Sequence, residues 1–250
     1  MLIAHTTDLT GDDTSAFVHA SALAAASASQ LVTVHGNAPD TAASMLPDAA
    51  ELATRWGRAI HHERRCHECC DEVADTVLDV LRELRPELVV LGTHGRQGLA
   101  AFVRGSISEA ITRNLAVPAL VVPNYSHGFV DAATGAIDLR RILIPARTVA
   151  DALRGLGAAR RLLALAGSTD AILELVHVGA SDPALEQLGV ALTRVDGPLE
   201  DAILDVARAH GACVIVMPTS GHDGFGDVLL GSHTERVIRE AACPVLSIPL

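Results

Sequence analysis

Two glycine-rich segments of the chain could each hold a phosphate group. In the first, Gly92-Thr93-His94-Gly95 is followed after nine residues by Gly105-Ser106; in the second, Pro218-Thr219-Ser220-Gly221 is followed after nine residues by Gly231-Ser232. An apolar run typical of a strand precedes each segment. A strand that leads through a glycine-rich turn into a helix exposes backbone N–H groups at the positive end of the helix dipole. Because the copies lie 126 residues apart, the sequence predicts two related domains.

A second candidate site is the segment His61–Cys70, which holds three of the five cysteines and three of the twelve histidines. Cys66, Cys69 and Cys70 are spaced i, i+3 and i+4, so one helical turn would bring them together. His62 precedes Cys66 by four residues and would be the fourth ligand. Three sulfurs and an imidazole suit tetrahedral zinc. Two alternatives stay open: the cysteines pack in the core, or they form a redox thiol site favoured by the neighbouring arginines.

The composition excludes several classes of function. The chain has 30 acidic and 19 basic residues and a formal net charge of -11, which is opposite to what a nucleic-acid partner requires. No apolar run approaches the length of a membrane span, and the N-terminus shows no secretory signal. The cysteine spacing does not resemble a disulfide framework. We therefore expect a cytoplasmic protein with neither nucleic-acid nor membrane partners.

Apolar runs and helical periodicities alternate along both halves, which predicts parallel sheets with helices on both faces. In the first half we expect, in order, Leu2–His5, Ser15–Ser29, Leu31–His35, Pro47–Trp56, Ala59–Glu63, Asp71–Leu84, Glu87–Leu91, Ser106–Asn114 and Ala119–Val122. Asp12, Asp13 and Thr14 are available to cap the helix Ser15–Ser29. In the second half we expect Arg141–Ile144, Ala152–Ala166, Ile172–His177, Leu199–Ala209 and Cys213–Met217. The first strands align at an offset of about 139, so the second copy is shorter by roughly a dozen residues. The shortening corresponds to Asn37–Cys70, and Asn124–Ile137 has the composition of a linker.

The pattern Gly-x-x-Gly, nine residues, Gly-Ser between a strand and its helix resembles the nucleotide-binding motif of the universal stress protein family. The resemblance covers nearly all of the chain except the linker and the Cys/His segment. It implies two tandem Rossmann-like (adenine nucleotide α-hydrolase-like) α/β domains, each with a five-stranded parallel sheet flanked by helices. We place the first domain at 1–125, the linker at 126–137 and the second domain at 138–250.

For the first domain, the resemblance implies an ATP site. Asp8, in Asp8-Leu9-Thr10, stands where the first strand of the family usually ends in an aspartate and would face the adenosine. The loop glycines would allow the backbone to approach ribose and phosphate closely. The implied ligand-binding residues are Asp8, Gly92, His94, Gly95, Arg96, Gly105, Ser106 and Ser108. In this family ATP is held rather than rapidly turned over.

The second copy departs from this pattern in two places. Pro218 replaces the first glycine, which removes a backbone donor and fixes φ. Arg147 stands where the aspartate is expected and reverses the charge there. The residues that keep the pattern and could still hold an anion are Gly221, Gly231, Ser232 and Thr234. We expect one working nucleotide site beside a diverged copy.

Three functions compete on this basis. The first is an ATP-binding universal stress protein with a regulatory role, in which ATP hydrolysis is at most slow. The second is a zinc- or redox-sensing adaptor that acts through Cys66–Cys70. The third, adenylation of a substrate, is the weakest, because no acid–base pair or pyrophosphate loop is present in the sequence. Family domains pair through their last strands, which implies that Val117–Val122 and Pro244–Ile248 pair within one chain as a pseudo-dimer. Further association into a homodimer stays open.

Overall fold

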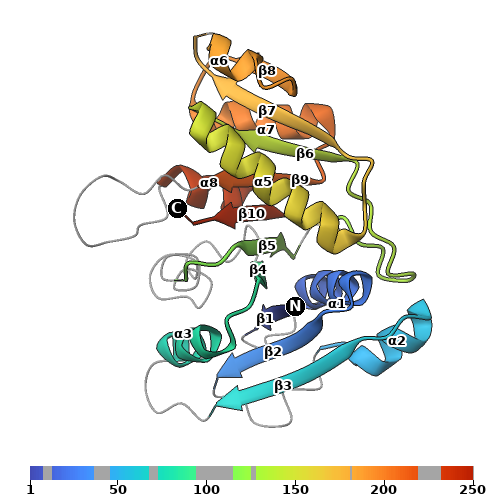
Figure 1. Ribbon diagram of the computed structural model, residues 1–250. Coiled ribbons are helices and arrows are strands. Elements are labelled where there is room, and N and C mark those ends of the chain that lie inside the picture. Colours follow the sequence, from blue (N-terminus) through green and yellow to red (C-terminus); the bar gives the residue numbers. More distant parts are fainter. Residues whose placement is uncertain are drawn as a thin grey trace.

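The computed structural model of the chain describes residues 1–7, 13–36, 46–67, 73–93, 115–124, 128–180, 182–218 and 232–249. Within these residues, the strands form one ten-stranded sheet in the order β3-β2-β1-β4-β5-β10-β9-β6-β7-β8 (Figure 1). The strands are β1 Leu2–Thr6, β2 Gln30–Gly36, β3 His61–His67, β4 Leu88–Thr93, β5 Ala119–Pro123, β6 Arg141–Pro145, β7 Ile172–Val178, β8 Ala191–Val195, β9 Val214–Pro218 and β10 Val245–Ile248. The helices are α1 Thr14–Ser27, α2 Ala49–Trp56, α3 Val73–Leu84, α5 Val149–Ala166, α6 Pro183–Glu186, α7 Leu199–His210 and α8 Ser232–Glu240.

The sheet consists of two half-sheets joined at their last strands. In each half the first strand lies between the second and the fourth, and neighbouring strands run parallel. The halves meet where β10 pairs antiparallel with β5, with Val245 opposite Val121 and Ser247 opposite Ala119. This pairing confirms the predicted contact between the last strands. The predicted α/β fold with two five-stranded parallel half-sheets is also confirmed.

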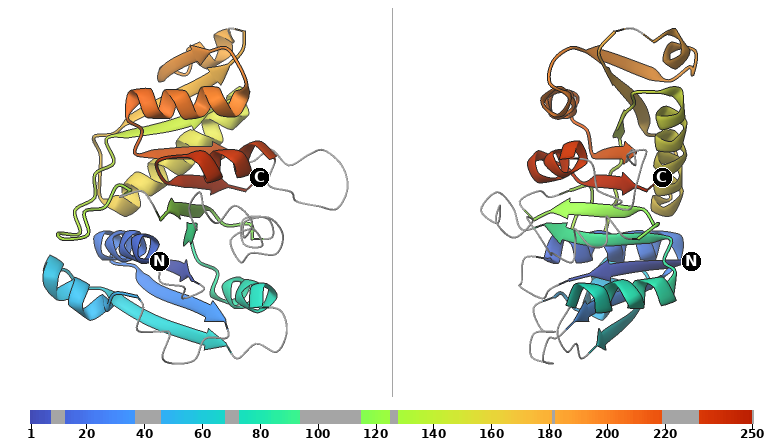
Figure 2. Two further views of the ribbon diagram at one scale, coloured as in Figure 1. Left: turned by 180° about the vertical axis from the view of Figure 1, so that it is seen from behind. Right: turned by 90° about the vertical axis from the view of Figure 1, so that its left-hand side faces the viewer.

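Helices cover both faces of the sheet, so each strand contributes side chains alternately to two apolar cores (Figure 2). One core lies beneath α1, α2, α5 and α6, and the other beneath α3, α7 and α8. In β1, for example, Ile3 enters the first core and its neighbour Ala4 enters the second. On the first of these faces, α1 packs beside α5 and joins the two halves.

Local sequence signals set the ends of several helices. Thr148 and Asp151 form a capping box at the start of α5, in which each side chain accepts a hydrogen bond from the backbone N–H of the other residue. Gly167 ends this helix with a φ of 65°, in the left-handed region that glycine adopts at low cost. The α5 helix therefore begins three residues before the predicted Ala152 and ends at the predicted Ala166.

Three regions differ from the sequence prediction. Strand β3 covers His61–His67 rather than Ala59–Glu63, because its pairing with β2 continues to His67. The shorter second half keeps a third strand, β8, and carries the single turn of α6 where the first half has α2. In the first half, Asp13 precedes α1 as predicted, but its side chain makes no hydrogen bond with the helix N-terminus.

The segment predicted as a linker is partly a packed element. Residues 128–138, hereafter the connector, fold back on themselves through the bridge between Val130 and Ile137. The backbone N–H of Phe129 donates to Nε2 of His19 in α1 at 3.1 Å. The indole N–H of Trp56, at the end of α2, donates to the carbonyl of Ala132 at 3.2 Å. The connector is therefore fastened to the helices of the first half.

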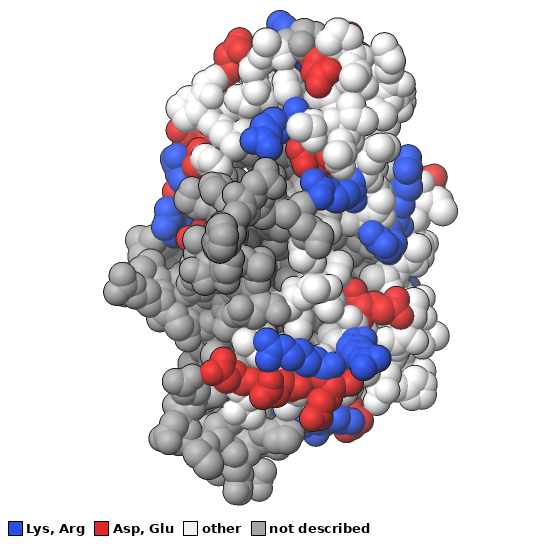
Figure 3. Space-filling model, turned by 60° about the vertical axis from the view of Figure 1, so that its left-hand side comes forward, with Lys and Arg blue, Asp and Glu red and all other residues white. Residues whose placement is uncertain are grey.

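On the face seen in Figure 3, acidic side chains of the described residues form a band low on the molecule, and basic side chains border it. Within the described ranges, no helix has both the length and the apolar character needed to cross a membrane.

Candidate functional site

In each half, the strand order reverses direction between the first and the fourth strand. In the first half these strands are β1 and β4, and in the second half they are β6 and β9. Ligands of doubly wound sheets bind in the crevice that opens beyond the carboxyl ends of such strands. The two candidate sites of this chain therefore lie at corresponding places in the two halves.

The first-half site is closely packed around Gly92, near the carboxyl end of β4. A Cβ atom at Gly92 would collide with Oδ1 of Asp13 and would lie 3.1 Å from Oδ1 of Asn124. Asp13 is buried, and its carboxylate accepts a hydrogen bond from the hydroxyl of Thr7, just beyond β1. Only glycine lets these side chains approach β4 so closely, which explains the residue type at position 92.

Asn124 follows β5 and brings an unusual group to this site. Its amide nitrogen and oxygen are both buried, and neither has a hydrogen-bond partner among the described residues. A buried amide without partners raises the free energy of the folded protein by about 1–3 kcal/mol. Such a group close to Gly92 is what a site for a polar ligand would contain.

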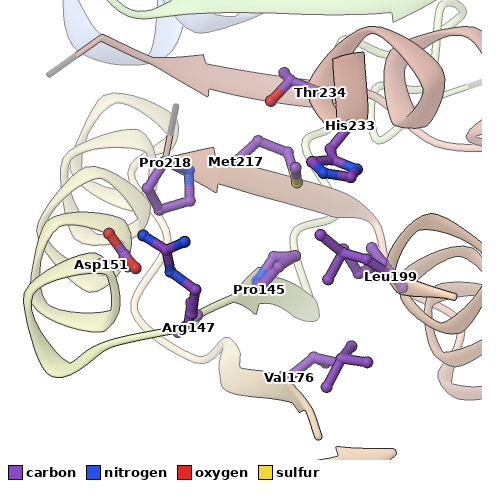
Figure 4. Close-up of a pocket in the computed structure, with 12 residues that line it drawn as sticks. Pro145, Arg147, Asp151, Val176, Leu199, Met217, Pro218, His233 and Thr234 are labelled. Carbon is purple, nitrogen blue, oxygen red and sulfur yellow. The ribbon is translucent and has the colours of Figure 1, made fainter. Parts of the chain in front are cut away.

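The second-half site is an open cleft of about 410 Å³ at the carboxyl ends of β6, β7 and β9 (Figure 4). Most of its wall is apolar, and the polar part comes from the segment just after β6, from α5 and from α8. The lining residues are Pro145, Ala146, Arg147, Asp151, Val176, Val178, Leu199, Ile203, Met217, Pro218, His233 and Thr234.

Two carboxylates beside this cleft already have basic partners. Asp151 accepts from Arg154 at 2.7 Å; burial alone would raise the pKa of Asp151, but the hydrogen bonds from Thr148 and Arg154 outweigh it and lower that pKa. Glu200 accepts from Nδ1 of His233 at 2.9 Å, and this hydrogen bond lowers the pKa of Glu200. Arg147 is exposed, and no ion pair joins it to another described residue.

Comparison with known proteins agrees with this fold. The family model described as "Universal stress protein family" matches residues 3–123 and 184–249. The chain belongs to the universal stress protein family. A universal stress protein of Mycobacterium tuberculosis is 26% identical over 224 residues, covering 77% of this chain and 73% of the relative.

Solved structures extend the likeness of fold over the whole chain. A universal stress protein from Archaeoglobus fulgidus has a TM-score of 0.66 at 18% identity, covering 99% of this chain and 96% of that one. A functionally unknown protein from Pseudomonas aeruginosa has a TM-score of 0.69 at 16% identity, covering 99% and 92%. The fold of the whole chain, with both of its halves, is thus shared with solved structures.

Most of the predicted ATP-binding residues lie outside the described residues. These are Asp8, His94, Gly95, Arg96, Gly105, Ser106 and Ser108 in the first half, and Gly221 and Gly231 in the second. Of the others, Gly92 lies at the first-half site, Ser232 begins α8, and Thr234 lines the second-half cleft. The ATP site as a whole therefore stays a prediction.

The predicted helical turn of the Cys/His segment is wrong at its first residue. Cys66 lies in β3, and α3 begins only at Val73. The ring of His62, four residues earlier on the same strand, is held by the hydroxyl of Thr33 at 2.9 Å and packs edge-on against Phe17. Four strand residues span about 13 Å, so His62 is poorly placed to share a metal with Cys66.

Zinc binding by the remaining cysteines stays a prediction, since Cys69 and Cys70 lie outside the described residues. Across the part of the chain that the structure describes, no group of three or more His, Cys, Asp or Glu side chains could hold a metal ion.

Two residues of the sites escaped the sequence prediction. Asn124 fell in the predicted linker, and Asp13 was assigned to helix capping. A positional signal for Asn124 exists: it directly follows the last strand of the half-sheet, at the edge where ligands bind.

Proposed function

We propose that the first half binds ATP at the carboxyl edge of β1, β4 and β5, and that this stress-response protein acts by holding the nucleotide. The observation that carries the proposal is the buried amide of Asn124, which lacks a partner among the described residues beside Gly92. Membership of the universal stress protein family and the Gly-x-x-Gly motif support the same ligand.

The chemistry of Asn124 suits an adenine base. A carboxamide offers a donor and an acceptor side by side, and asparagine pairs in this way with the N6 and N7 atoms of adenine. Binding an adenine would give the buried amide the hydrogen bonds that it lacks. Asp13 and Thr7 already satisfy each other, so they shape the site without needing the ligand.

The decisive experiment identifies and counts the nucleotide retained by the purified protein. Acid precipitation followed by chromatography should release close to one ATP per chain, held by the first half. Gly105→Val should abolish retention, whereas Gly231→Val, the matched change in the second half, should leave it unchanged. Asn124→Leu should weaken ATP binding about 5- to 30-fold, as the loss of one or two buried hydrogen bonds implies.

Two results would contradict the proposal. One is retention that survives Gly105→Val but is lost in Gly231→Val, which would move the site to the second half. The other is an Asn124→Leu variant that folds normally and binds ATP as tightly as the unmodified protein.

A zinc or redox role is the second function we propose to test in the same preparation. It is favoured by the position of Cys66 near the carboxyl end of β3, the same edge of the sheet as Gly92. Zinc measured per chain should fall in Cys66→Ser and Cys69→Ser if this segment binds metal. Unchanged zinc content in both variants would reject zinc binding by this segment.

A further inference from the structure

We infer that the second-half cleft binds a small organic anion with an apolar body, and that Arg147 and Thr234 hold its charged group. This site differs from the proposed ATP site in position and in chemistry. It is formed by β6, β7, β9, α7 and the start of α8, all in the second half (Figure 4).

The shape and wall of the cleft suit such a ligand. A volume of about 410 Å³ is within the range of small-molecule sites, which are mostly apolar with a few polar groups. Apolar side chains line the cleft from two sides, the sheet and α7. The sheet contributes Pro145, Val176, Met217 and Pro218, and α7 contributes Leu199 and Ile203. Leu199 is among the few large apolar side chains that are exposed, so the cleft offers apolar surface that a ligand would cover.

Arg147 is a cationic side chain of the cleft wall. The carboxylate of Asp151 is paired with Arg154, and that of Glu200, which does not line the cleft, lies 3.9 Å from the guanidinium of Arg236. Arg147 points into the cleft in Figure 4 and has no ion pair with a described residue. A cation beside apolar surface and without its own counter-ion favours an anionic ligand.

Thr234 adds a second polar side chain to the wall of the cleft. The residue is 4% exposed and lines the cleft, and its hydroxyl is turned toward the cavity in Figure 4. Thr234 lies in the first turn of the nine-residue helix α8, where backbone N–H groups favour negative charge.

The features that suit adenine in the first half are replaced in this cleft. Pro218 stands at the position of Gly92 and has no N–H to donate. At the offset that aligns the glycine motifs, Leu250 takes the place of Asn124 in the sequence, so the carboxamide is lost. The missing N–H donor of Pro218 makes the second-half cleft a poorer match for a nucleotide, and its mostly apolar wall suits an amphipathic anion.

Binding can be measured by calorimetry with four probes. Hexanoate and hexyl phosphate are the two anionic probes, and they distinguish a carboxylate from a phosphate head group. Hexanamide is the neutral counterpart, and ATP is the competitor. We expect saturable binding of at least one anionic probe at concentrations up to about 10 mM, with hexanamide at least tenfold weaker.

The variants assign the site. Arg147→Gln should weaken binding of the anionic probe about tenfold or more, and Thr234→Val several-fold. Arg194→Gln is the matched control, since this exposed arginine lies on β8 and does not line the cleft. Circular dichroism and thermal unfolding identify any variant that fails to fold. If Arg147→Gln fails to fold, Arg147→Lys replaces it in the test. This variant keeps the positive charge and should therefore retain binding of the anionic probe.

Three results would overturn the inference: no saturable binding of either anionic probe, equal binding of hexanamide, or binding that Arg147→Gln leaves unchanged. If ATP displaces the probe, and if the Thr234→Val protein binds ATP more weakly, the cleft is a second nucleotide site instead. The Gly105→Val protein should still bind the anionic probe, so that failure of the proposed ATP site and failure of this inference are distinguishable.

Discussion

The two halves share one strand order but differ in a polar cluster that each holds within its sheet. The first half has a pair of imidazoles: His5, which is buried, and His62, which is half-buried, both contact the hydroxyl of Thr33 and pack against Phe17. The second half buries a charged carboxylate: Glu174, on β7, accepts hydrogen bonds from Arg141, Thr193 and His210. One scaffold therefore tolerates either solution, provided that each buried group is neutral or well paired.

Because of this difference, we expect the two halves to lose stability in different pH ranges. Burial lowers the pKa of His5 to about 3, and the pKa values of His19 and His62 to about 4. Burial alone would raise the pKa of Glu174, but the hydrogen bonds from Thr193, Arg141 and His210 outweigh it and lower that pKa. The imidazoles stabilise the folded state fully above their ordinary pKa of 6.5 and lose this contribution as pH falls toward 4, because the unfolded chain gains protons first. The contribution of Glu174 is present above its ordinary pKa of 4.5 and is lost only below it.

The largest effect we expect comes from removing the buried carboxylate of the second half. Glu174→Ala should lower the free energy of unfolding by about 3–5 kcal/mol at pH 7, because it removes a buried carboxylate together with the three hydrogen bonds that it accepts from Thr193, His210 and the half-buried Arg141. The matched change Glu63→Ala, in a pair with Arg65 that is roughly half exposed, should cost less than about 1 kcal/mol. Urea unfolding measures both, and similar losses would remove the distinction between the halves.

The next effect is the acid response of the first half. Nδ1 of His19 donates to the carbonyl of Ser15, and its Nε2 accepts from Phe129, so the neutral ring satisfies both groups. Replacing it by glutamine should flatten the dependence of stability on pH between 6.5 and 4 by about 3 kcal/mol, the equivalent of its lowered pKa. Trp56 is the only tryptophan and lies in the first half, so its fluorescence during urea unfolding follows this region.

Hydrogen exchange provides the comparison within one molecule. Amides of β1 and β2 should lose protection as pH falls from 6.5 to 4, before those of β6 and β7. Simultaneous loss of protection in both halves would contradict separate acid windows, as would a His19→Gln slope equal to that of the unmodified protein.

A smaller effect tests the attachment of the connector to the first half. Gly135 has a φ of +67°, and a Cβ there would collide with the indole of Trp56. Gly211, which ends α7, has a φ of +64° and open space around it. Gly135→Ala and Gly211→Ala introduce the same backbone strain, but only Gly135→Ala also introduces a collision with Trp56. Gly135→Ala should therefore destabilise the protein by about 1–3 kcal/mol more than Gly211→Ala and shift Trp56 fluorescence to longer wavelength. Equal losses would show that the connector does not need its contact with Trp56.

Features that depend on neighbouring residues or on a repeat could be predicted from the sequence. The tandem domains followed from the repeated glycine motif, and the pairing of β5 with β10 followed from the family resemblance. The bounds of β3 could not be predicted, because His61–His67 is mostly polar and lacks the apolar alternation of a typical half-buried strand. That strand is fixed by seven successive pairings with β2, which no local pattern reveals.

The sites were predictable to different degrees for the same reason. Gly92, Arg147 and Pro218 stood out by comparing the two copies. The connector and Asn124 did not, because their roles depend on contacts across the chain: Phe129 meets His19 from 110 residues away, and Trp56 meets Ala132 from 76. The acid-resistant pairing of Glu174 likewise needs three strands and a helix to assemble around it.

The smallest effect we expect concerns α5, which covers the second half as α1 covers the first. Gly157 lies in the helix with open space around its Cα, so Gly157→Ala should raise the free energy of unfolding by about 0.5–1 kcal/mol. Two residues earlier, a Cβ at Gly155 would collide with the buried side chain of Ile144 on β6. At the offset that aligns the first strands, Ala16 and His5 of the first half correspond to Gly155 and Ile144. At Gly155 the cost of overpacking should exceed the gain in helix propensity, so Gly155→Ala should lower the free energy of unfolding measured with a chemical denaturant. An increase in the free energy of unfolding for both variants would show that α5 approaches its strands no more closely than α1 does.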